Sequence, residues 1–291
     1  MRFLFVDLIE ACDADRIVGR KTFASADPMQ YLEPGFDPMI APGVICEAMG
    51  QLASWLCLQR TDFTMRPVFL FADSIQNFAE VRPGDPVRLE ARFHDFASDS
   101  CRFSANAHVG DTLVQTLDNC AMSFIPLAEL EDPLLARQRF EALSTGGLTY
   151  PDHEGAPFAF RQLIDQVLIQ EASSMILVEK RFAEDEAFYP DHFPRFPVTP
   201  VVMLNEMIGQ AHRRLLGLDA MSSLKVRRID TCKIRNFVRP GESCQARIKV
   251  LKVEQKTSSR WLTSEAEILK DNKRILRATW QLEWEGAHDH V

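Results

Sequence analysis

The stretch H-F-P-R-F-P-V-T-P-V-V-M-L-N-E-M-I-G-Q runs from His192 to Gln210 and decides how the rest of the chain is interpreted. It begins as a proline-rich loop and continues as an apolar segment in which Glu206 follows His192 by fourteen residues. A shorter version, P-G-V-I-C-E-A-M-G-Q at residues 42–51, contains Glu47 at the matching place. The chain therefore carries one helix motif twice.

Two further landmarks accompany each motif in the same order, which is the pattern of an internal duplication. An apolar stretch that ends in aspartate comes before the motif, and we expect it to form a short strand. An aspartate ten residues ahead of a Pro-Gly turn comes after the motif. The matching pairs are Phe3–Asp7 with Phe160–Asp165, Glu47 with Glu206, and Asp73 with Asp230, at offsets of 158, 159 and 157 residues.

Each half is predicted to contain one long helix and several strands. The segment from Val44 to about Leu58 is apolar on nearly every side, as in a helix that is buried all round. Pro42 suits the first turn of this helix because its missing N–H has no helical partner there. After each Pro-Gly turn the sequence alternates between polar and apolar residues, which is typical of antiparallel strands. An α+β fold is therefore favoured, with a curved antiparallel sheet around a central helix in each half.

A connector of different composition separates the halves. Residues 127–157 include a proline-led segment, Pro133 to Leu143, that is predicted to form a short helix. We therefore expect an N-terminal domain at residues 1–126 and a C-terminal domain at residues 158–286. The connector is long enough to cross the face of a domain.

Composition restricts the classes of protein that the chain can represent. Its 291 residues, 46% of them hydrophobic, allow a core in each half. A net charge of −8 argues against nucleic-acid binding, which needs a clustered positive field. The chain lacks an apolar run of about 18 residues and a signal-peptide core, so we expect a cytoplasmic protein without a membrane partner. Seven scattered cysteines without a C-x-x-C pair predict neither disulfides nor a metal site.

The motif of the second half resembles the signature of the FabA/FabZ β-hydroxyacyl-acyl-carrier-protein dehydratases, H-F-P-G-x-P-V-M-P-G-x-x-x-x-[ED]-A-M-x-Q. The spacing of fourteen residues between His192 and Glu206 is kept. Residues 42–51 are similar to the helix part of that signature, and residues 70–91 are similar to a strand region of the family. The resemblance spans nearly all of both halves. It implies a double hot-dog fold, in which the two halves pack as a pseudo-dimer.

The resemblance also implies where an active site forms. Family members build each site across a dimer interface, with the histidine from one subunit and the acid from the other. His192 is therefore expected to face Glu47, and Gln51, one helical turn further on, is expected to orient that acid. In the first half, Pro34 or a near neighbour stands where the family has its histidine. Glu206 would then belong to a degenerate second site.

The chain departs from the signature where Arg195 and Val201 replace two glycines. Unpaired N–H groups at the start of a buried helix would stabilise an enolate oxygen that develops during the reaction. Gly43 and Val44 start one such helix and Val201 starts the other, and the sequence leaves open which of them serves the site. The side chain of Val201 would approach the thioester.

The implied reaction is loss of water from a 3-hydroxyacyl thioester to give a trans-2-enoyl thioester. Histidine suits the base because its pKa lies near neutrality. A glutamate in an apolar tunnel has a raised pKa and can donate a proton. The expected partner is acyl carrier protein or an acyl-CoA thioester, with the substrate carried on phosphopantetheine and no separate cofactor. A homodimer of the pseudo-dimer is one option for assembly.

Two other hypotheses stay open from the sequence. A thioesterase or an enoyl isomerase could use the same fold, although hot-dog thioesterases more usually lack the H-F-P loop. A catalytically inactive scaffold, which pairs with an active dehydratase, is favoured by the missing first-half histidine and by Arg195 and Val201. Among pathways of fatty-acid or polyketide biosynthesis, the tandem form favours a specialised lipid, polyketide or polyene route.

Overall fold

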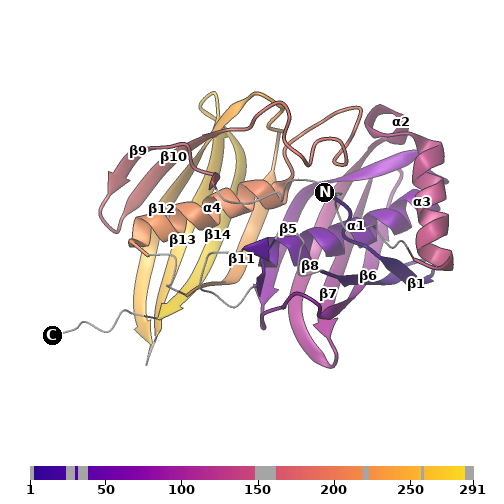
Figure 1. The fold of residues 1–291 in the computed structure, drawn as a ribbon, viewed down its shortest axis with the longest axis horizontal. Helices are drawn as coiled ribbons and strands as arrows, with labels where there is room; N and C mark the ends of the chain where they lie inside the picture. Colours follow the sequence, from indigo (N-terminus) through magenta and orange to yellow (C-terminus); the bar gives the residue numbers. More distant parts are fainter. Residues whose placement is uncertain are drawn as a thin grey trace.

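The computed structural model describes residues 3–23, 30–31, 39–147, 162–218, 223–256 and 259–285. Two long helices cross one face of a long antiparallel sheet, and two shorter ones lie at its side (Figure 1). The helices are α1 (Pro42–Arg60), α2 (Leu127–Leu130), α3 (Pro133–Thr145) and α4 (Val201–Leu216). The strands are β1 (Leu8–Cys12), β2 (Arg16–Thr22), β3 (Gln30–Tyr31), β4 (Met39–Ile40), β5 (Met65–Asn77), β6 (Pro86–Phe96), β7 (Ser100–Val109), β8 (Thr112–Pro126), β9 (Gln166–Glu171), β10 (Met175–Arg181), β11 (Leu224–Ile234), β12 (Ser243–Lys256), β13 (Ser259–Lys270) and β14 (Lys273–Glu285).

The order of the strands relates the two halves to each other. Within the described residues, twelve strands form one sheet in the order β1-β2-β6-β7-β8-β5-β11-β14-β13-β12-β10-β9. The order in the second half is the reverse of the order in the first. At the centre, β5 and β11 pair antiparallel, with Ser74 opposite Asp230. Because equivalent edge strands pair antiparallel, the halves are related by a pseudo-twofold axis and share one continuous sheet.

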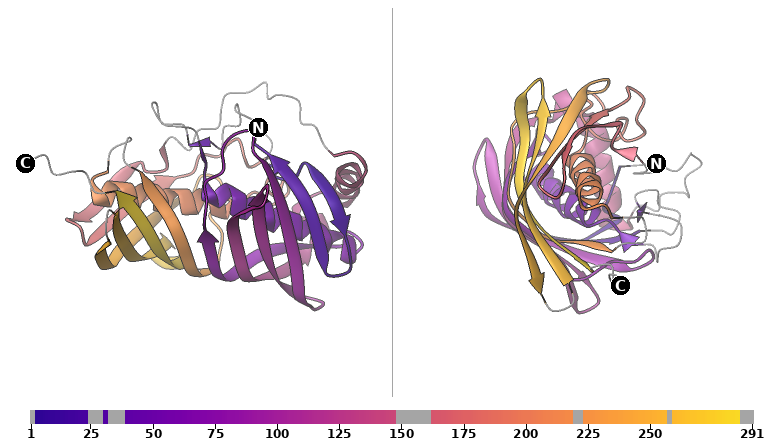
Figure 2. Two further views of the ribbon diagram at one scale, coloured as in Figure 1. Left: turned by 90° about the horizontal axis from the view of Figure 1, so that it is seen from below. Right: turned by 90° about the vertical axis from the view of Figure 1, so that its left-hand side faces the viewer.

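The helices α1 and α4 cover the curved sheet on the same side, one in each half (Figure 2). Pro42 lies in the first turn of α1, as predicted, and the helix is buried along most of its length between Val44 and Leu58. The N-terminal turns of α1 and α4 approach closely, since a Cβ atom at Gly43 would lie 3.1 Å from Cγ2 of Val202. The predicted double hot-dog fold, with the halves packed as a pseudo-dimer, is therefore confirmed.

Equivalent aspartates make the same contacts in both halves. Asp7 accepts hydrogen bonds from Nζ of Lys21 and from the next backbone N–H, at 2.9 and 2.8 Å. Asp165 accepts from Nζ of Lys180 and from the next backbone N–H, both at 2.8 Å. In each half the aspartate thus fixes the end of the strand that follows the first hairpin turn.

The prediction that Phe3–Asp7 and Phe160–Asp165 form strands is wrong for the residues that the structure describes. In the first half β1 begins at Leu8, and in the second β9 begins at Gln166. The backbone N–H groups of Phe3 and Phe5 donate to side chains, those of Asp191 and Gln51, at 3.0 and 2.9 Å. The backbone of Phe3 and Phe5 therefore bonds to side chains, and within the described residues 3–7 a bond to strand β2 is made only at Asp7, whose N–H donates to the carbonyl oxygen of Arg20 at 2.8 Å. Both phenylalanines are 1% exposed.

The connector contains the short helix that the sequence predicts. It begins at Pro133 as expected and ends at Thr145, two residues beyond the predicted Leu143. Asp132 caps it, because its side chain accepts from the N–H groups of Leu134 and Leu135. Residues 148–161 lie outside the described part, and the domain limits at residues 126 and 158 stay a prediction. None of the described helices is long and apolar enough to cross a membrane.

Candidate active site

A cavity of about 150 Å³ lies between the two halves. It is bounded by one face of α1, the start of β5, the loop before α4 and the first turns of α4. His192 lines it from the second half of the chain and Glu47 lines it from the first. The structure therefore brings the predicted pair into one cavity. Gly43, Gln51 and Val201 also line this cavity, whereas Pro34 lies outside the described residues.

Glu47 lies on the face of α1 that borders the cavity. Burial raises the pKa of its carboxyl group, and the donated hydrogen bond from Gln51 and the charge of Arg66 oppose that rise. Nε2 of Gln51 lies 2.9 Å from Oε1 of Glu47. Desolvation is the largest influence, so burial shifts the carboxyl group toward its protonated form.

His192 is held by its own loop. Its backbone N–H donates to the carbonyl oxygen of Phe188 at 2.9 Å, and its Nδ1 lies 3.0 Å from the carbonyl oxygen of Val198. Because a carbonyl oxygen can only accept, Nδ1 carries the proton of the neutral ring and Nε2 carries the lone pair. The ring stacks on Phe193 at a centroid distance of 4.4 Å and meets Phe3 edge-on at 5.2 Å. Burial lowers the pKa of His192 to about 4, so the ring is a neutral base at pH 7.

A second buried histidine shows what a purely structural histidine looks like in this fold. His212 on α4 bonds through Nδ1 to the carbonyl oxygen of Ile208 at 2.9 Å and through Nε2 to Oγ of Ser264 at 2.7 Å. Both ring nitrogens are thus engaged inside the core. At His192 only Nδ1 has such a partner among the described residues, which leaves Nε2 for a ligand in the cavity.

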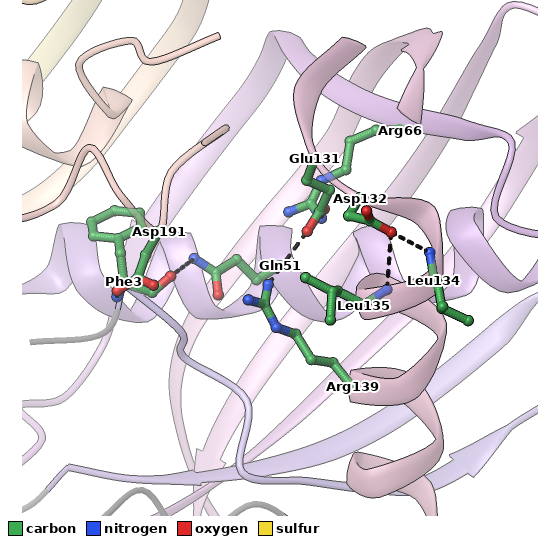
Figure 3. Close-up of polar contacts among 9 residues, drawn as sticks. All are labelled: Phe3, Gln51, Arg66, Glu131, Asp132, Leu134, Leu135, Arg139 and Asp191. Atoms are coloured by element: carbon green, nitrogen blue, oxygen red, sulfur yellow. Dashed lines mark hydrogen bonds and ion pairs between the residues drawn. The ribbon is translucent and has the colours of Figure 1, made fainter. Parts of the chain in front are cut away.

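The N-terminal segment joins the histidine loop to α1 (Figure 3). The N–H of Phe3 donates to Oδ2 of Asp191, the residue before His192, at 3.0 Å. The carbonyl oxygen of Phe3 lies 3.3 Å from Nε2 of Gln51. A short chain of contacts therefore runs from the histidine loop through Phe3 to the side chain that contacts Glu47. Asp191 was not predicted from the sequence, although its place beside His192 was a usable signal.

Arg66 is a second residue that the sequence analysis missed. Its Nη1 atom pairs with Oε1 of Glu131. The other oxygen of that carboxylate, Oε2, lies 3.4 Å from Nη1 of Arg139 on α3 (Figure 3). All three side chains line the cavity. The arginine is close enough for its charge to lower the pKa values of both Glu47 and His192. An arginine inside the apolar run M-R-P-V-F-L-F at residues 65–71 was the signal available in the sequence.

Arg195, one of the two departures from the family signature, is exposed and does not line the cavity. Its guanidinium group donates to the carbonyl oxygen of Ala128 at 2.8 Å and lies 3.3 Å from Oδ2 of Asp132. Its backbone N–H donates to the carbonyl oxygen of Leu130 at 2.9 Å. The arginine thus ties the histidine loop to the connector, and it leaves the cavity open.

The candidate oxyanion donors are placed differently. Val201 begins α4 and lines the cavity, and no side chain caps this helix. Gly43 of α1 also lines the cavity. The N–H of Val44 instead donates to the carbonyl oxygen of Ala41 at 2.9 Å, and its side chain is fully buried. The geometry therefore disfavours Val44 as a donor, because its N–H is already used.

Asn205, on the second turn of α4, is a further polar group at this cavity. Its Oδ1 atom is buried and has no hydrogen-bond partner among the described residues. A buried acceptor of this kind is costly unless a donor reaches it. An N–H or O–H group of a bound substrate would satisfy it.

Glu206 does not line the cavity of His192 but a second one, of about 200 Å³. No histidine borders this second cavity among the residues that the structure describes. In the described ranges, no cluster of three or more histidine, cysteine or acidic side chains could hold a metal ion.

Comparisons with known proteins agree with the double hot-dog fold. A family model with the description "ApeI-like: ApeI dehydratase" matches residues 168–271. The 3-hydroxyacyl-[acyl-carrier-protein] dehydratase FabZ of Oenococcus oeni is 30% identical over 100 residues, which are 33% of this chain and 72% of that protein. The chain belongs to the FabA/FabZ-like dehydratase family.

Other curated relatives are matched over a shorter part of their length. FabZ of Desulforamulus reducens is 30% identical over 94 residues, which are 31% of this chain. The chain spans 66% of that protein, slightly less than two thirds of its length.

Solved structures support the fold. A Lactobacillus plantarum protein described as an oleoyl thioesterase aligns over 94% of this chain and 98% of its own, with 10% identity and a TM-score of 0.60. The dehydratase domain of PpsC from Mycobacterium tuberculosis, solved in complex with C12:1-CoA, aligns over 98% and 100%, with 13% identity and a TM-score of 0.52. At these identities the likeness shows the hot-dog fold alone.

Proposed function

We propose that the protein removes water from a 3-hydroxyacyl thioester at one site, formed by His192 and Glu47, and gives a trans-2-enoyl thioester. The observation that supports this most is the presence of both groups in one cavity with complementary proton states. Burial keeps the imidazole neutral and favours the protonated carboxyl group. A neutral base beside a protonated acid is what elimination of water requires.

In this mechanism Nε2 of His192 takes the proton from C2 of the acyl chain. The electrons of that C–H bond form the C2–C3 double bond while the bond from C3 to the hydroxyl oxygen breaks. Glu47 gives its proton to the departing hydroxyl group, which leaves as water. Transfer of the proton from Nε2 back to the Glu47 carboxylate restores the starting state, so the cycle needs no other reactant.

The negative charge that develops on the thioester oxygen needs a fixed donor. We assign this role to the N–H of Val201, because it lies at the positive end of α4 and in the same loop-helix unit as His192. Gly43 is the second candidate, since it lines the same cavity from α1.

The substrate is proposed to be carried on the phosphopantetheine arm of acyl carrier protein, with an acyl-CoA as its surrogate. The curated relatives bear the name of 3-hydroxyacyl-[acyl-carrier-protein] dehydratases, and the PpsC domain was solved with an acyl-CoA. The single His–Glu pair further implies that two hot-dog units were fused and that only one of their two equivalent sites is catalytically active.

The test is the reverse reaction, hydration of an enoyl thioester. Its rate is monitored as the decrease in absorbance of the conjugated enoyl group. His192→Ala and Glu47→Gln should each lower the rate by about a hundredfold or more, since each removes a proton-transfer group. Glu206→Gln is the matched control, because Glu206 lies at the equivalent place on α4 and lines the other cavity. Equal loss with both glutamate variants would overturn the asymmetric site.

The same assay separates the alternatives. Release of free thiol without loss of the enoyl group would favour a thioesterase, the activity named for the Lactobacillus plantarum structure. An unchanged rate with His192→Ala would favour an inactive scaffold whose apparent activity comes from another protein.

A further inference from the structure

The second cavity is constructed like the first. Each cavity lies between the N-terminal turn of one long helix and the acid-bearing face of the other. Glu47 and Gly50 border the first cavity, and their counterparts Glu206 and Gly209, each 159 residues later, border the second. At about 200 Å³ the second cavity is no smaller than the first, at about 150 Å³. The loss of a histidine has therefore not closed it.

The walls of the second cavity combine apolar side chains with several charged ones, among them Glu206 and Arg213, and with the buried amide of Gln115. Ile45, Val81 and Val114 line it, and each is at most 3% exposed. Gln115 lines it as well and is 2% exposed. Such a lining of apolar side chains around a few polar groups is typical of sites for small molecules.

The orientation of the Gln115 amide is fixed by its neighbours. Nε2 donates to the carbonyl oxygen of Pro42 at 2.9 Å and to Oδ1 of Asn77. Nδ2 of Asn77 donates in turn to the carbonyl oxygen of Val226 at 2.8 Å, which keeps its Oδ1 directed at Gln115. Oε1 of Gln115 is consequently the atom left over, and it is buried without a hydrogen-bond partner among the described residues. A buried acceptor in this position calls for a donor from a bound molecule.

We propose that this second cavity binds an acyl-pantetheine group without converting it, with an amide N–H of the pantetheine arm donating to Oε1 of Gln115. The proposal rests on the proposed function, from which it takes the class of ligand. The pantetheine arm offers amide donors, and the attached acyl chain matches the apolar wall. Because no described residue supplies a histidine base there, the bound acyl group would keep its hydroxyl. The chain would then hold one reacting and one waiting acyl group.

Two glycines provide a matched pair of blocking variants. A Cβ atom added at Gly50 or at Gly209 would meet no atom within 4 Å, so a side chain there can extend into the adjoining cavity. Both positions are helical, where replacement of glycine also favours the helix. Gly50→Phe should fill the first cavity, and Gly209→Phe should fill the second.

The probe is decanoyl-pantetheine in which an amide replaces the thioester. Calorimetry measures how many equivalents of this probe bind to each protein chain. The unmodified protein should bind two equivalents per chain, and each phenylalanine variant should bind one. Hydration of an enoyl thioester should be lost with Gly50→Phe and kept with Gly209→Phe. Ala79→Trp, on the exposed rim of the second cavity, is a second blocking variant should Gly209→Phe not fold.

Gln115→Leu tests the hydrogen bond itself. It should weaken the second binding event about tenfold and leave the first unchanged, since one hydrogen bond to a buried acceptor is removed. The proposal would be overturned if the unmodified protein bound only one equivalent of the probe and if Gly209→Phe and Ala79→Trp left that binding unchanged. Two equivalents bound by a protein without hydration activity would contradict the proposed dehydratase reaction but leave the second site standing.

Discussion

Gln51 connects Glu47 to the backbone of the N-terminal segment, because its Nε2 lies 2.9 Å from Oε1 of the glutamate while its own Oε1 accepts from the N–H of Phe5, also at 2.9 Å. A backbone N–H can only donate, so the amide cannot turn over. Oε1 of Glu47 therefore always receives a proton donor, and the proton of the neutral acid resides on Oε2. The glutamine thus sets which oxygen of the acid can donate to a substrate.

Gln51→Leu should lower kcat for enoyl hydration by about tenfold, because the loss of one hydrogen bond frees the carboxyl group to rotate. The pKa of Glu47 should rise further, since the donated bond is one of the influences that lower it. The loss of activity at alkaline pH would then shift to higher pH. The measurement is kcat against pH, and an unchanged alkaline limb would show that Gln51 does not act on Glu47.

The sequence predicted the parts of this site that lie within one repeated motif. The course of α1 and the halving of the chain follow from local pattern and spacing, whereas the pairing of His192 with Glu47 was implied by the resemblance to the dehydratase signature. That Phe3 and Phe5 lie outside any strand was missed, because apolar residues alone do not show whether backbone N–H groups bond to a strand or to a side chain. Arg66 was missed because its partner Glu131 lies 65 residues away and is brought to it only by tertiary packing.

The direction of Arg195 was equally beyond the reach of sequence pattern. A large charged residue in place of a glycine suggests a blocked site, yet the side chain points to the connector, at Ala128 and Asp132. The N–H of Val44 is a similar case, since its bond to Ala41 depends on the local shape of the first helical turn. Sequence pattern thus identified which residues lie at or near the site. It did not show in which direction their polar atoms point.

Arg66→Met should move the whole pH profile of enoyl hydration to higher pH. The rate in either direction needs one proton on the His192–Glu47 pair, so protonation of both groups sets the acid limb and loss of the last proton, from Glu47, sets the alkaline limb. The charge of Arg66 lowers both pKa values, so its removal should raise both. The remaining charged neighbours, Glu131 and Arg139, still pair with each other.

The control for this shift is Arg66→Lys, which keeps the positive charge and should leave both limbs close to their original positions. Initial rates would be compared between about pH 3 and about pH 9, because the acid limb depends on His192, whose pKa is about 4. Limbs that stay in place with Arg66→Met would show that the arginine only supports the connector.

Arg195→Gly, which restores the residue of the family signature, should lower kcat and leave KM nearly unchanged. The glycine cannot hold Ala128 and Asp132, so the loop that carries His192 keeps only the backbone bond to Leu130 as its tie to the connector. Misplacement of a catalytic group by about 1 Å can cost about a hundredfold in rate, and partial loosening should cost less. Asp132→Asn, which keeps the cap of α3, should give a smaller effect in the same direction. A more active Arg195→Gly variant would mean that the arginine hinders the loop.

Acidification should destabilise the protein before most carboxylates titrate. The pKa values of His192 and His212 are both lowered by burial from 6.5 to about 4. The unfolded chain therefore takes up two protons near pH 6.5 that the folded protein refuses until about pH 4. As the pH falls from about 6.5 to about 4, the free energy of unfolding should thus decrease, by up to about 1.4 kcal/mol per pH unit for each histidine.

His212→Gln isolates one of these contributions, because His212 lies in the core away from the first cavity and bonds only to Ile208 and Ser264. The variant loses stability at every pH, so the informative quantity is the change in the free energy of unfolding between about pH 7 and about pH 5, measured with urea. Glu47, whose pKa is raised, acts in the opposite sense in both proteins and cancels in the comparison. The unmodified protein should lose more stability over this interval than the variant. An equal loss would mean that His212 accepts a proton in the folded state, which its two hydrogen bonds argue against.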